Sequence, residues 1–448
     1  MSHYKPYPAY KDSGVEWLGL VPEHWAVCKL SFRYSIELGK MLDEKKLTKT
    51  SLVPYLRNQD VQWDSINTQD LPEMDIHPEE LERYSIRDGD LLVCEGGDVG
   101  RAAIWRGKSA IFGYQKALHR LRHRSSGADT AEFFFFSLLT AKQRGVFEES
   151  DSKATIAHLP AEKFRQYRFA FPPLSEQQVI AAHLDRETAR IDALIEKKTR
   201  FIELLREKRQ ALITHAVTKG LDPGVKMKDS GVEWLGEVPE HWGLTPLKRL
   251  VSSIGQGWSP ECEARIPEDG EWGVLKVGCV NGGVFRSEES KALPAEMEPR
   301  PELGLKKGDV LVSRANTREL VGSCAVVPCD YPHLLLCDKL YRIGCSERVT
   351  PDFLAALITV YGRRAVEVEA TGASSSMVNI AQSVILDLRV AVPSTDEQDE
   401  IISRVSIAMS RIDDLRGKTE HSITLLKERR SALITAAVTG QIDLRETV

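Results

Sequence analysis

The sequence predicts an α+β protein in which two strand-rich domains alternate with two long helices. The first observation is a duplication. KDSGVEWLGLVPEHW begins at Lys11, KDSGVEWLGEVPEHW begins at Lys228, and fourteen of the fifteen positions are identical. The second is a shared ending, because EKRQALITHAVTKGLD ends at Asp222 and ERRSALITAAVTGQID ends at Asp443. A unit of about 220 residues is therefore repeated, with nearly constant flanks around a diverged middle.

The first part of each repeat, which we call the clip segment, is rich in large apolar side chains and punctuated by Gly and Pro. Packing onto the following domain is favoured over direct ligand binding for such a segment. Its apolar residues are Trp17, Leu18, Val21, Pro22 and Trp25 in the first repeat and Trp234, Leu235, Val238, Pro239 and Trp242 in the second.

The second part of each repeat is a globular middle, at about 26–171 and 243–392. Its short apolar runs are broken by Gly, Asp and Asn, which is typical of strands joined by turns. A helical stretch is expected late in each copy. The runs that predict strands are 52–56, 90–94, 102–105, 274–277 and 310–313, and the helices are expected at 131–144 and 351–364.

The third part is a long helix. In the first repeat it is expected to begin after Pro172-Pro173, with Ser175 and Gln178 as a capping box, and to end at Gly220. Residues 176–217 alone number 42, which corresponds to about 63 Å of helix. Apolar residues alternate in steps of four and three and form an imperfect heptad seam. They are Ile191, Ile195, Ile202, Leu205 and Leu212.

The second long helix is expected to have Thr395 or Asp396 as its N-cap and to end at Gly440. Its apolar stripe includes Ile412, Ile423, Leu426 and Leu433. Two such seams favour an antiparallel coiled coil with internal pseudo-two-fold symmetry; the alternative is two independent helices that pack on other subunits. The predicted domains are 1–171 with the first clip segment, 172–222 as the first long helix, 223–392 with the second clip segment, and 393–448 as the second long helix and tail.

The composition is that of an ordinary soluble protein, with 42% hydrophobic and 28% charged residues. The net charge of -5 gives no global signal for nucleic acid, although binding requires only a local basic surface. The N-terminus has no apolar stretch like that of a signal peptide, and the apolar runs are too short to span a bilayer. We therefore expect no membrane association and a cytoplasmic location.

The eight cysteines do not follow the duplication, since six lie in the second half, and no two have the spacing of a zinc knuckle. Reduced, mostly buried thiols are expected. The alternative is a metal site built from Cys324, Cys329, Cys337 and Cys345.

No catalytic signature is found in the sequence. Gly107-Lys108-Ser109 lacks the preceding glycine of a phosphate-binding loop, and no dinucleotide fingerprint or metal-protease spacing is present. Phe171-Pro172-Pro173-Leu174 is not the motif with which amino-methyltransferases hold a flipped base, and it is better explained as the stop before the long helix. The sequence therefore favours binding over catalysis.

The diverged middles differ most in one loop. Runs 88–105 and 307–327 align at both strand ends, but the second loop is three residues longer and replaces Glu95-Gly96-Gly97-Asp98 with Arg314-Ala315-Asn316-Thr317-Arg318. A loop that changes while its strands stay is typical of a variable reader, and Arg, Asn, Gln and Lys can reach base edges. An ordinary solvated surface remains the alternative for each residue. The candidates for base edges include Arg57 and Lys276, which align, with Asn58, Gln59, Arg314, Asn316, Thr317 and Arg318; those for phosphates are Lys116, Arg120, Lys339 and Arg342; Arg101, Lys153 and Ser375 complete the predicted DNA-binding set.

The duplicated motifs resemble those of the specificity subunit of type I restriction–modification enzymes. These motifs are GVEWLGxVPEHW, FPPLSEQQVIAAHLD and IDALIEKKTRFIELLREKRQALITHAVTKG, and the resemblance covers nearly the whole chain. The second copy departs at the helix start, where Val392-Pro393-Ser394 has a single proline.

The resemblance implies that two target-recognition domains each read one half of a split, asymmetric DNA sequence, while the paired helices fix the spacer between the halves. It implies two modification subunits that carry S-adenosylmethionine and methylate adenine, and restriction subunits that bring ATP- and Mg-dependent translocation and cleavage. The chain itself would hold no cofactor, no metal and no catalytic residue. Two alternatives stay open: an enzyme with its own DNA-modifying site, and a coiled-coil scaffold without a role on DNA.

Overall fold

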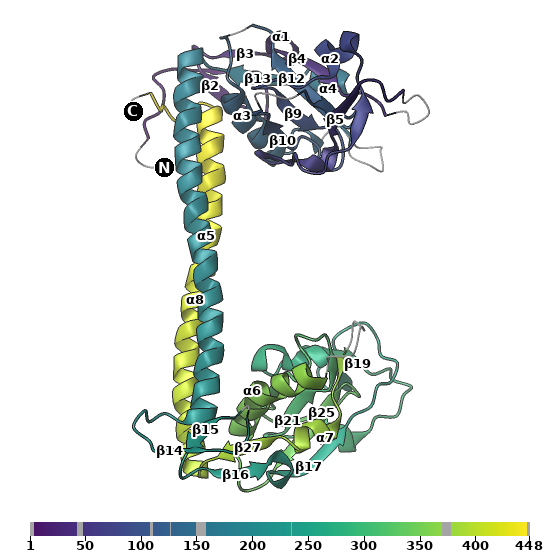
Figure 1. Ribbon diagram of the computed structural model, residues 1–448, viewed down its shortest axis with the longest axis vertical. Coiled ribbons are helices and arrows are strands. Elements are labelled where there is room, and N and C mark those ends of the chain that lie inside the picture. The colour runs from purple at the N-terminus through teal and green to yellow at the C-terminus, as the bar shows by residue number, and fades with distance from the viewer. Residues whose placement is uncertain are drawn as a thin grey trace. The chain divides into compact units, whose positions relative to one another are not determined.

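The computed structural model describes residues 4–42, 48–107, 111–125, 127–148, 158–233, 235–369 and 378–445. The chain forms two compact units. Unit 1 comprises Met1–Thr199 and Glu420–Val448, and unit 2 comprises Arg200–Thr419. The two long helices, α5 (Leu174–Lys219) and α8 (Thr395–Val438), each contribute one stretch to either unit (Figure 1). Each unit therefore combines one strand-rich domain with parts of both helices.

Unit 1 is built on a four-stranded antiparallel sheet in the order β10-β9-β12-β4. A three-stranded sheet, β11-β5-β8, and the helix α3 complete the domain. Residues 133–136 of α3 are consecutive phenylalanines, and all are buried in the main core with the sheet. The strands are β4 (Tyr34–Leu38), β5 (Leu52–Leu56), β6 (Val61–Gln62), β7 (Ser65–Ile66), β8 (Glu73–Asp75), β9 (Leu91–Cys94), β10 (Ala102–Ile104), β11 (Gly113–Tyr114) and β12 (Leu118–His123); the helices are α1 (Leu30–Arg33), α2 (Leu81–Tyr84), α3 (Ala131–Gln143) and α4 (Ala161–Phe164), with 3-10 turns η2 (Asn58–Asp60) and η3 (Pro78–Glu80).

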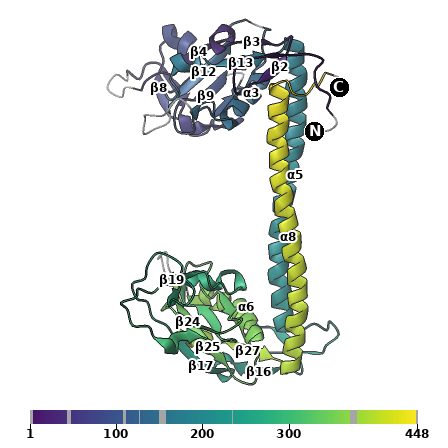
Figure 2. The same cartoon turned by 180° about the vertical axis from the view of Figure 1, so that it is seen from behind.

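Unit 2 repeats this plan with a four-stranded antiparallel sheet in the order β17-β25-β21-β23 and a second sheet in the order β19-β18-β24-β20. The helix α6 takes the place of α3 (Figure 2). The strands are β17 (Val251–Gln256), β18 (Gly273–Leu275), β19 (Ser290–Ala292), β20 (Gly304–Leu305), β21 (Val310–Ser313), β22 (Ala315–Asn316), β23 (Cys324–Val326), β24 (Tyr331–Leu335), β25 (Leu340–Cys345) and β26 (Val378–Asn379); the helices are α6 (Pro351–Glu369) and α7 (Gln382–Leu386), with 3-10 turns η5 (Leu247–Arg249), η6 (Val277–Gly283) and η7 (Pro301–Leu303).

The clip segments pack onto their domains, as predicted. Each forms a two-stranded hairpin followed by a strand that pairs with the last strand of the domain, β3 with β13 and β16 with β27. Trp25 and Trp242 are fully buried in the two main cores. Trp234 lies outside the described residues. The elements are β1 (Tyr10–Asp12), β2 (Leu20–Pro22), β3 (Ala26–Lys29) and β13 (Arg168–Phe171) in unit 1, and β14 (Met227–Asp229), β15 (Glu237–Pro239), β16 (Gly243–Pro246) and β27 (Arg389–Val392) in unit 2.

The start of each long helix is fixed by a glutamate and a glutamine that both repeats share. Glu176 accepts hydrogen bonds from Trp25 Nε1 at 2.9 Å and Tyr7 Oη at 2.5 Å, and His24 Nε2 lies 2.8 Å from its other oxygen. The Gln177 side chain accepts from the Thr130 amide at 2.9 Å and donates to the Pro172 carbonyl at 2.9 Å. One pair of side chains thus joins the clip segment, the start of α3 and the helix α5.

The same contacts recur in unit 2. Glu397 accepts from Trp242 Nε1 at 3.0 Å and lies 2.9 Å from His241 Nε2. Gln398 accepts from the Thr350 amide at 2.8 Å and donates to the Pro393 carbonyl at 3.0 Å. The Glu-Gln pair of the repeated motif therefore has a structural role.

The predicted helix caps are wrong by one or two residues. Helix α5 begins at Leu174, so Ser175 lies inside it, and the Glu176 amide donates to the Pro173 carbonyl. Helix α8 begins at Thr395, and Ser394 Oγ accepts from the Glu397 amide at 3.4 Å. Both helices begin close to the last proline of their motif. Helix α5 begins at the residue after Pro173, and helix α8 begins two residues after Pro393. The predicted ends are confirmed, because Gly220 and Gly440 adopt φ values of 76° and 71°.

Within each unit the two long helices pack antiparallel. Unit 1 contains the start of α5 and the end of α8, and unit 2 contains the end of α5 and the start of α8. In unit 1, Ile180 and Leu184 share a core with Leu433 and Ile434. In unit 2, Val217 shares a core with Ile401 and Val405. Figures 1 and 2 both show α5 and α8 side by side. The predicted antiparallel pairing is confirmed. Among the described residues, no helix has the length and hydropathy needed to cross a membrane.

Candidate nucleic-acid interface

One loop in each unit follows the central strand of the main sheet. Variable loop 1 (95–101) joins β9 to β10, and variable loop 2 (314–323) joins β21 to β23. The strands pair in the same way, Cys94 with Leu118 and Ser313 with Leu340. The second loop is three residues longer, as the sequence alignment predicted.

The same backbone contacts hold the first residue of each loop. The Glu95 amide donates to the Ala117 carbonyl at 3.0 Å, and the Glu95 carbonyl accepts from the Leu159 amide at 2.8 Å. The Arg314 amide donates to the Lys339 carbonyl at 2.9 Å, and its carbonyl accepts from Ile380 at 2.8 Å. A common cradle thus presents two different loops.

Asn58 and Arg101 hold variable loop 1 in shape. The Asn58 amide donates to the Gly96 carbonyl at 2.8 Å, and the Arg101 guanidinium donates to both the side-chain and the backbone oxygen of Asn58 at 3.0 Å. Both predicted site residues are half-buried and engaged with the loop. They shape this surface more than they project from it.

Variable loop 2 has a buried base and an exposed tip. Asn316 is buried, its side chain donates to Ser313 Oγ at 3.3 Å, and its backbone pairs with Val378 in the β22–β26 ladder. Thr317 and Arg318 are exposed. Of the predicted residues in this loop, these two project toward solvent.

The aligned cations Arg57 and Lys276 both directly precede a 3-10 turn. Arg57 Nε lies 2.8 Å from the buried carboxylate of Asp60, and Lys276 Nζ lies 3.8 Å from Glu289. Burial raises the pKa of Asp60, but the hydrogen bonds from Arg57 outweigh it and leave that pKa below its usual value. Each cation is partly neutralised, so its field at the surface is reduced.

Arg120 and Arg342, which were predicted to contact phosphate, both donate to backbone carbonyls of their own domains. Arg120 is buried, and its guanidinium donates to the carbonyls of Glu82, Arg83 and Ser85 at 2.9–3.1 Å. Arg342, at the equivalent place in unit 2, donates to the carbonyls of Gly304 and Glu302. Backbone carbonyls of neighbouring segments thus engage Nη1 of Arg120 and both terminal nitrogens of Arg342, so these two guanidiniums are held within their domains.

Comparison with known proteins finds matches over nearly the whole chain. Residues 22–204 match a family model described as the type I restriction modification DNA specificity domain. The type I restriction enzyme MjaVIII specificity subunit of Methanocaldococcus jannaschii is 26% identical over 454 residues, which cover 97% of each chain. Residues 22–204 therefore belong to this domain family, and nearly the whole chain is similar to type I specificity subunits.

Two further matches agree with this family. The type I restriction enzyme EcoEI specificity subunit of Escherichia coli is 28% identical over 208 residues, which span 45% of this chain and 34% of the relative. A solved structure described as showing complex assembly and conformational transition of the type I R-M system has 13% identity and a TM-score of 0.71, with 94% of this chain and 99% of that chain covered. At this identity the structural match shows the fold alone.

Of the residues predicted to contact phosphate, Lys116 and Lys339 are exposed, and each lies in the turn that carries the cradle carbonyl. Gly39 allows that turn to approach in unit 1, because a Cβ there would lie 2.3 Å from the Gln115 carbonyl oxygen. Gly257 has the same role against Leu336 in unit 2. Gln59 is exposed within the 3-10 turn η2 of unit 1. These exposed side chains are accessible to a ligand.

A cleft of about 410 Å³ lies beside variable loop 1. Its lining includes Lys116, Arg165, the buried carboxylate of Glu95, and His158, whose Nε2 lies 3.2 Å from Glu95. Burial raises the pKa of Glu95, against the lowering effect of His158 and Lys116. Sequence reasoning missed Glu95 as a site residue, although its exchange for Arg314 between the repeats was the available signal.

Two predicted site residues, Lys153 and Ser375, lie outside the described residues. The segments that follow them in the chain are described. His158 forms a β-bridge with Gly96 of variable loop 1, and β26 pairs with β22 of variable loop 2. In both units, a late segment of the domain therefore pairs with the variable loop.

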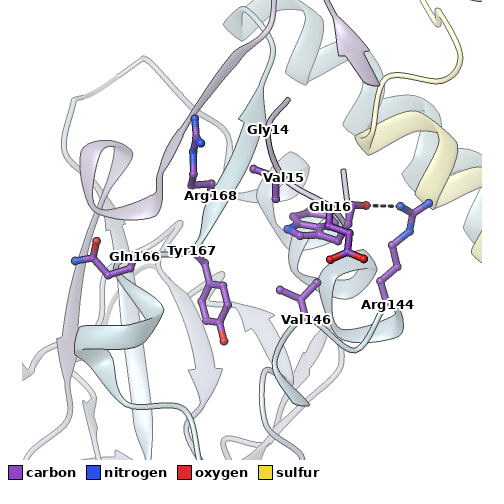
Figure 3. A pocket seen from close by; sticks show the side chains of 9 residues that line it. Gly14, Val15, Glu16, Arg144, Val146, Gln166, Tyr167 and Arg168 are labelled. Carbon is purple, nitrogen blue, oxygen red and sulfur yellow. Dashed lines mark hydrogen bonds between the residues drawn. The ribbon is translucent and has the colours of Figure 1, made fainter. Parts of the chain in front are cut away.

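A pocket of about 570 Å³ lies elsewhere on unit 1, between the clip segment, the end of α3 and β13 (Figure 3). The Arg144 guanidinium donates to the Trp17 carbonyl across it, and the Trp17 ring packs edge-on against Phe169 with centroids 5.5 Å apart. Four of its nine lining residues, 14–17, come from the clip segment, whose sequence both repeats share.

The proposed cysteine metal site is not assembled. Cys324 is buried in the main core of unit 2, Cys337 is buried in a separate cluster, and Cys329 is exposed. In the described part of the chain, no group of three or more metal-ligating side chains is placed to hold an ion.

Proposed function

We propose that each unit of this specificity subunit reads one half of a split double-stranded DNA sequence through its variable loop. The observation that supports this most strongly is the common cradle. Identical backbone contacts present loops that differ in length by three residues and that begin with opposite charges, Glu95 and Arg314. A constant support with a changing loop suits a binding surface whose target differs between the two units.

The exposed residues divide into two roles in this proposal. Arg318, Thr317 and Gln59 contact base edges in the major groove, where donors and acceptors distinguish all four base pairs. Lys116 and Lys339 contact phosphates and fix the register without reading sequence.

The scaffold that the units share binds the partner proteins. Two modification subunits dock on the clip segments and long helices and supply S-adenosylmethionine and the methylation chemistry; restriction subunits join them and bring ATP and Mg. The specificity subunit contributes recognition and no catalytic group. Its net charge of -5 fits a division of labour in which the partners neutralise much of the phosphate backbone.

A domain exchange tests this function. Residues 26–171 are replaced by the corresponding domain of another specificity subunit, and the adenine methylation of a genome is mapped with the modification subunit co-expressed. One half of the methylated sequence is expected to change and the other to persist. A change in both halves, or in neither, would contradict the assignment.

Two controls separate the alternatives. Purified chain with S-adenosylmethionine and DNA should incorporate no methyl groups, whereas an enzyme with its own site would incorporate them. An assembled complex whose DNA affinity does not fall with salt would indicate a scaffold without a role on DNA.

A further inference from the structure

Glu95 and Arg314 occupy one place in the fold with opposite charges. Each directly follows the last residue of the central strand, and each has its backbone held by the turn before β12 or β25 on one side and by a late segment of its domain on the other. The backbone is therefore constant at this position. The difference between the units lies in the side chain.

The Glu95 carboxylate is buried beside a cleft. Burying a carboxylate costs free energy unless the carboxylate is paired or accepts hydrogen bonds, so Glu95 in this position is expected to have a partner. His158 Nε2 is 3.2 Å away, and Lys116 and Arg165 line the same cleft of about 410 Å³. A carboxylate in such a setting can accept a hydrogen bond from an amino group that enters the cleft.

The Arg314 guanidinium in unit 2 is half-buried and incompletely paired. It lies over the ring of Tyr341 with 5.6 Å to the centroid, and one of its nitrogens donates to the Asp338 carbonyl at 3.3 Å. Its Nε is buried and has no hydrogen-bond partner among the residues that the structure describes. An aromatic ring thus orients a fork of donors that the fold uses only in part.

We propose that this position determines base specificity in both units: Glu95 accepts a hydrogen bond from the exocyclic amino group of a base, and Arg314 donates to a guanine edge. This inference rests on the proposed function. A carboxylate that accepts from cytosine and an arginine that donates to guanine are complementary solutions to reading one base pair. The constant cradle places either side chain at the same point of its half-site.

The test is methylation mapping with the full chain and its modification subunit, on a library in which both half-sites are randomised. Glu95→Gln keeps the size of the side chain and removes the charge. The preference at one base pair of the first half-site is expected to fall about 10- to 100-fold, the size of one lost base contact, while the second half-site stays unchanged. Arg314→Lys should relax one position of the second half-site and leave the first.

Two controls keep the test decisive. His158→Ala removes the neighbour of Glu95 but not its carboxylate, and Glu162→Gln changes another carboxylate of the same cleft; both should keep the base preference. If His158→Ala and Glu95→Gln relax the same position equally, Glu95 acts by supporting the fold and the inference is wrong. An even loss of methylation over all sequences, or an unchanged preference, would also overturn it.

The outcome is separable from that of the proposed function. A wild-type complex with no bipartite sequence would contradict the function itself. A bipartite sequence that Glu95→Gln leaves intact would contradict this inference alone. Thermal unfolding of each variant identifies any that fails to fold. If Glu95→Gln fails to fold, Glu95→Asp replaces it, because it keeps the charge and shortens the side chain. The preference at the same base pair is then expected to weaken, and an unchanged preference would overturn the inference.

Discussion

At the residue scale, burial and hydrogen bonding separate arginines that look alike in sequence. Arg318 projects from the tip of variable loop 2, whereas Arg342 donates to two carbonyls. We predict that Arg318→Ala relaxes one position of the second half-site by about 1–3 kcal/mol and leaves the unfolding temperature unchanged. Methylation mapping and thermal unfolding measure the two effects.

Arg342→Ala is the matched control. It should lower the free energy of unfolding by about 1–3 kcal/mol, because carbonyls that accept from a charged donor lose their partner. Recognition should weaken evenly over all sequences, if at all. A selective change at one base pair with Arg342→Ala would show that the prediction from the structure is wrong.

His119 predicts an acid-sensitive step in stability. Burial lowers its pKa to about 4, and Nε2 lies 2.7 Å from the Leu159 carbonyl. The unfolded state therefore binds a proton at a higher pH than the folded state does, and stability is lost as the pH falls from about 6.5 toward 4, by about 3 kcal/mol at most. His119→Gln should flatten this part of the curve of unfolding free energy against pH. A curve of unchanged slope would exclude His119 as its source.

At the element scale, the start of each long helix can be compared between the units. The Glu176 side chain is 4% exposed and Glu397 is 30% exposed. The difference arises because Tyr7 donates to Glu176, while its counterpart along the duplication is Gly224. Arg445 from the C-terminal tail also lies over the Tyr7 ring at 5.1 Å. The N-terminal segment and the tail thus close over the helix start in unit 1.

We predict that Glu176→Ala destabilises the chain by about 1–3 kcal/mol, because the Trp25 and Tyr7 donors remain buried without an acceptor. Glu397→Ala should cost less, because water can reach the Trp242 donor. Chemical denaturation of the two variants provides the comparison, with each serving as the control of the other. Equal losses would mean that Tyr7 contributes nothing.

How far the sequence could predict the elements depended on periodicity and on repetition. Strands 52–56 and 310–313 were predicted with their observed bounds, because apolar runs between turn residues mark both ends. In β12, however, residues 118–121 are all buried. The strand therefore lacks the alternation of apolar and polar residues from which the burial of Arg120 could have been predicted. The carbonyls to which Arg120 donates lie 35 to 38 residues away along the chain, and local sequence patterns do not predict contacts over such separations.

For the candidate site, the position of the variable loop could be predicted from the sequence. The loop and its change of length followed from aligning the repeats, since a duplication serves as an internal comparison. Which side chains project from the loop did not follow, because Asn316 is held in the ladder of β22 with β26 and is buried, whereas Arg318 lies beyond this ladder and is exposed. That ladder joins residues 62 and 64 positions apart.

At the scale of the whole molecule, both long helices belong to both units, so a change of helix length acts on the whole recognition surface. We predict that inserting one heptad into α5 between 199 and 200, and one into α8 between 419 and 420, makes the complex methylate half-sites further apart. Seven residues add about 10.5 Å of helix, or up to about three base pairs at roughly 3.4 Å each. A heptad keeps the apolar seam aligned because it is the repeat of the coiled coil.

The single insertion into α5 is the control, since it displaces the seam against an unchanged α8 and should lower stability without giving a new spacer. Both half-sites should keep their sequences in the double insertion, because neither variable loop is altered. Methylation mapping reads the spacer directly. A spacer that stays the same when both helices are lengthened would show that the helices do not set it, since their length is what the insertion changes.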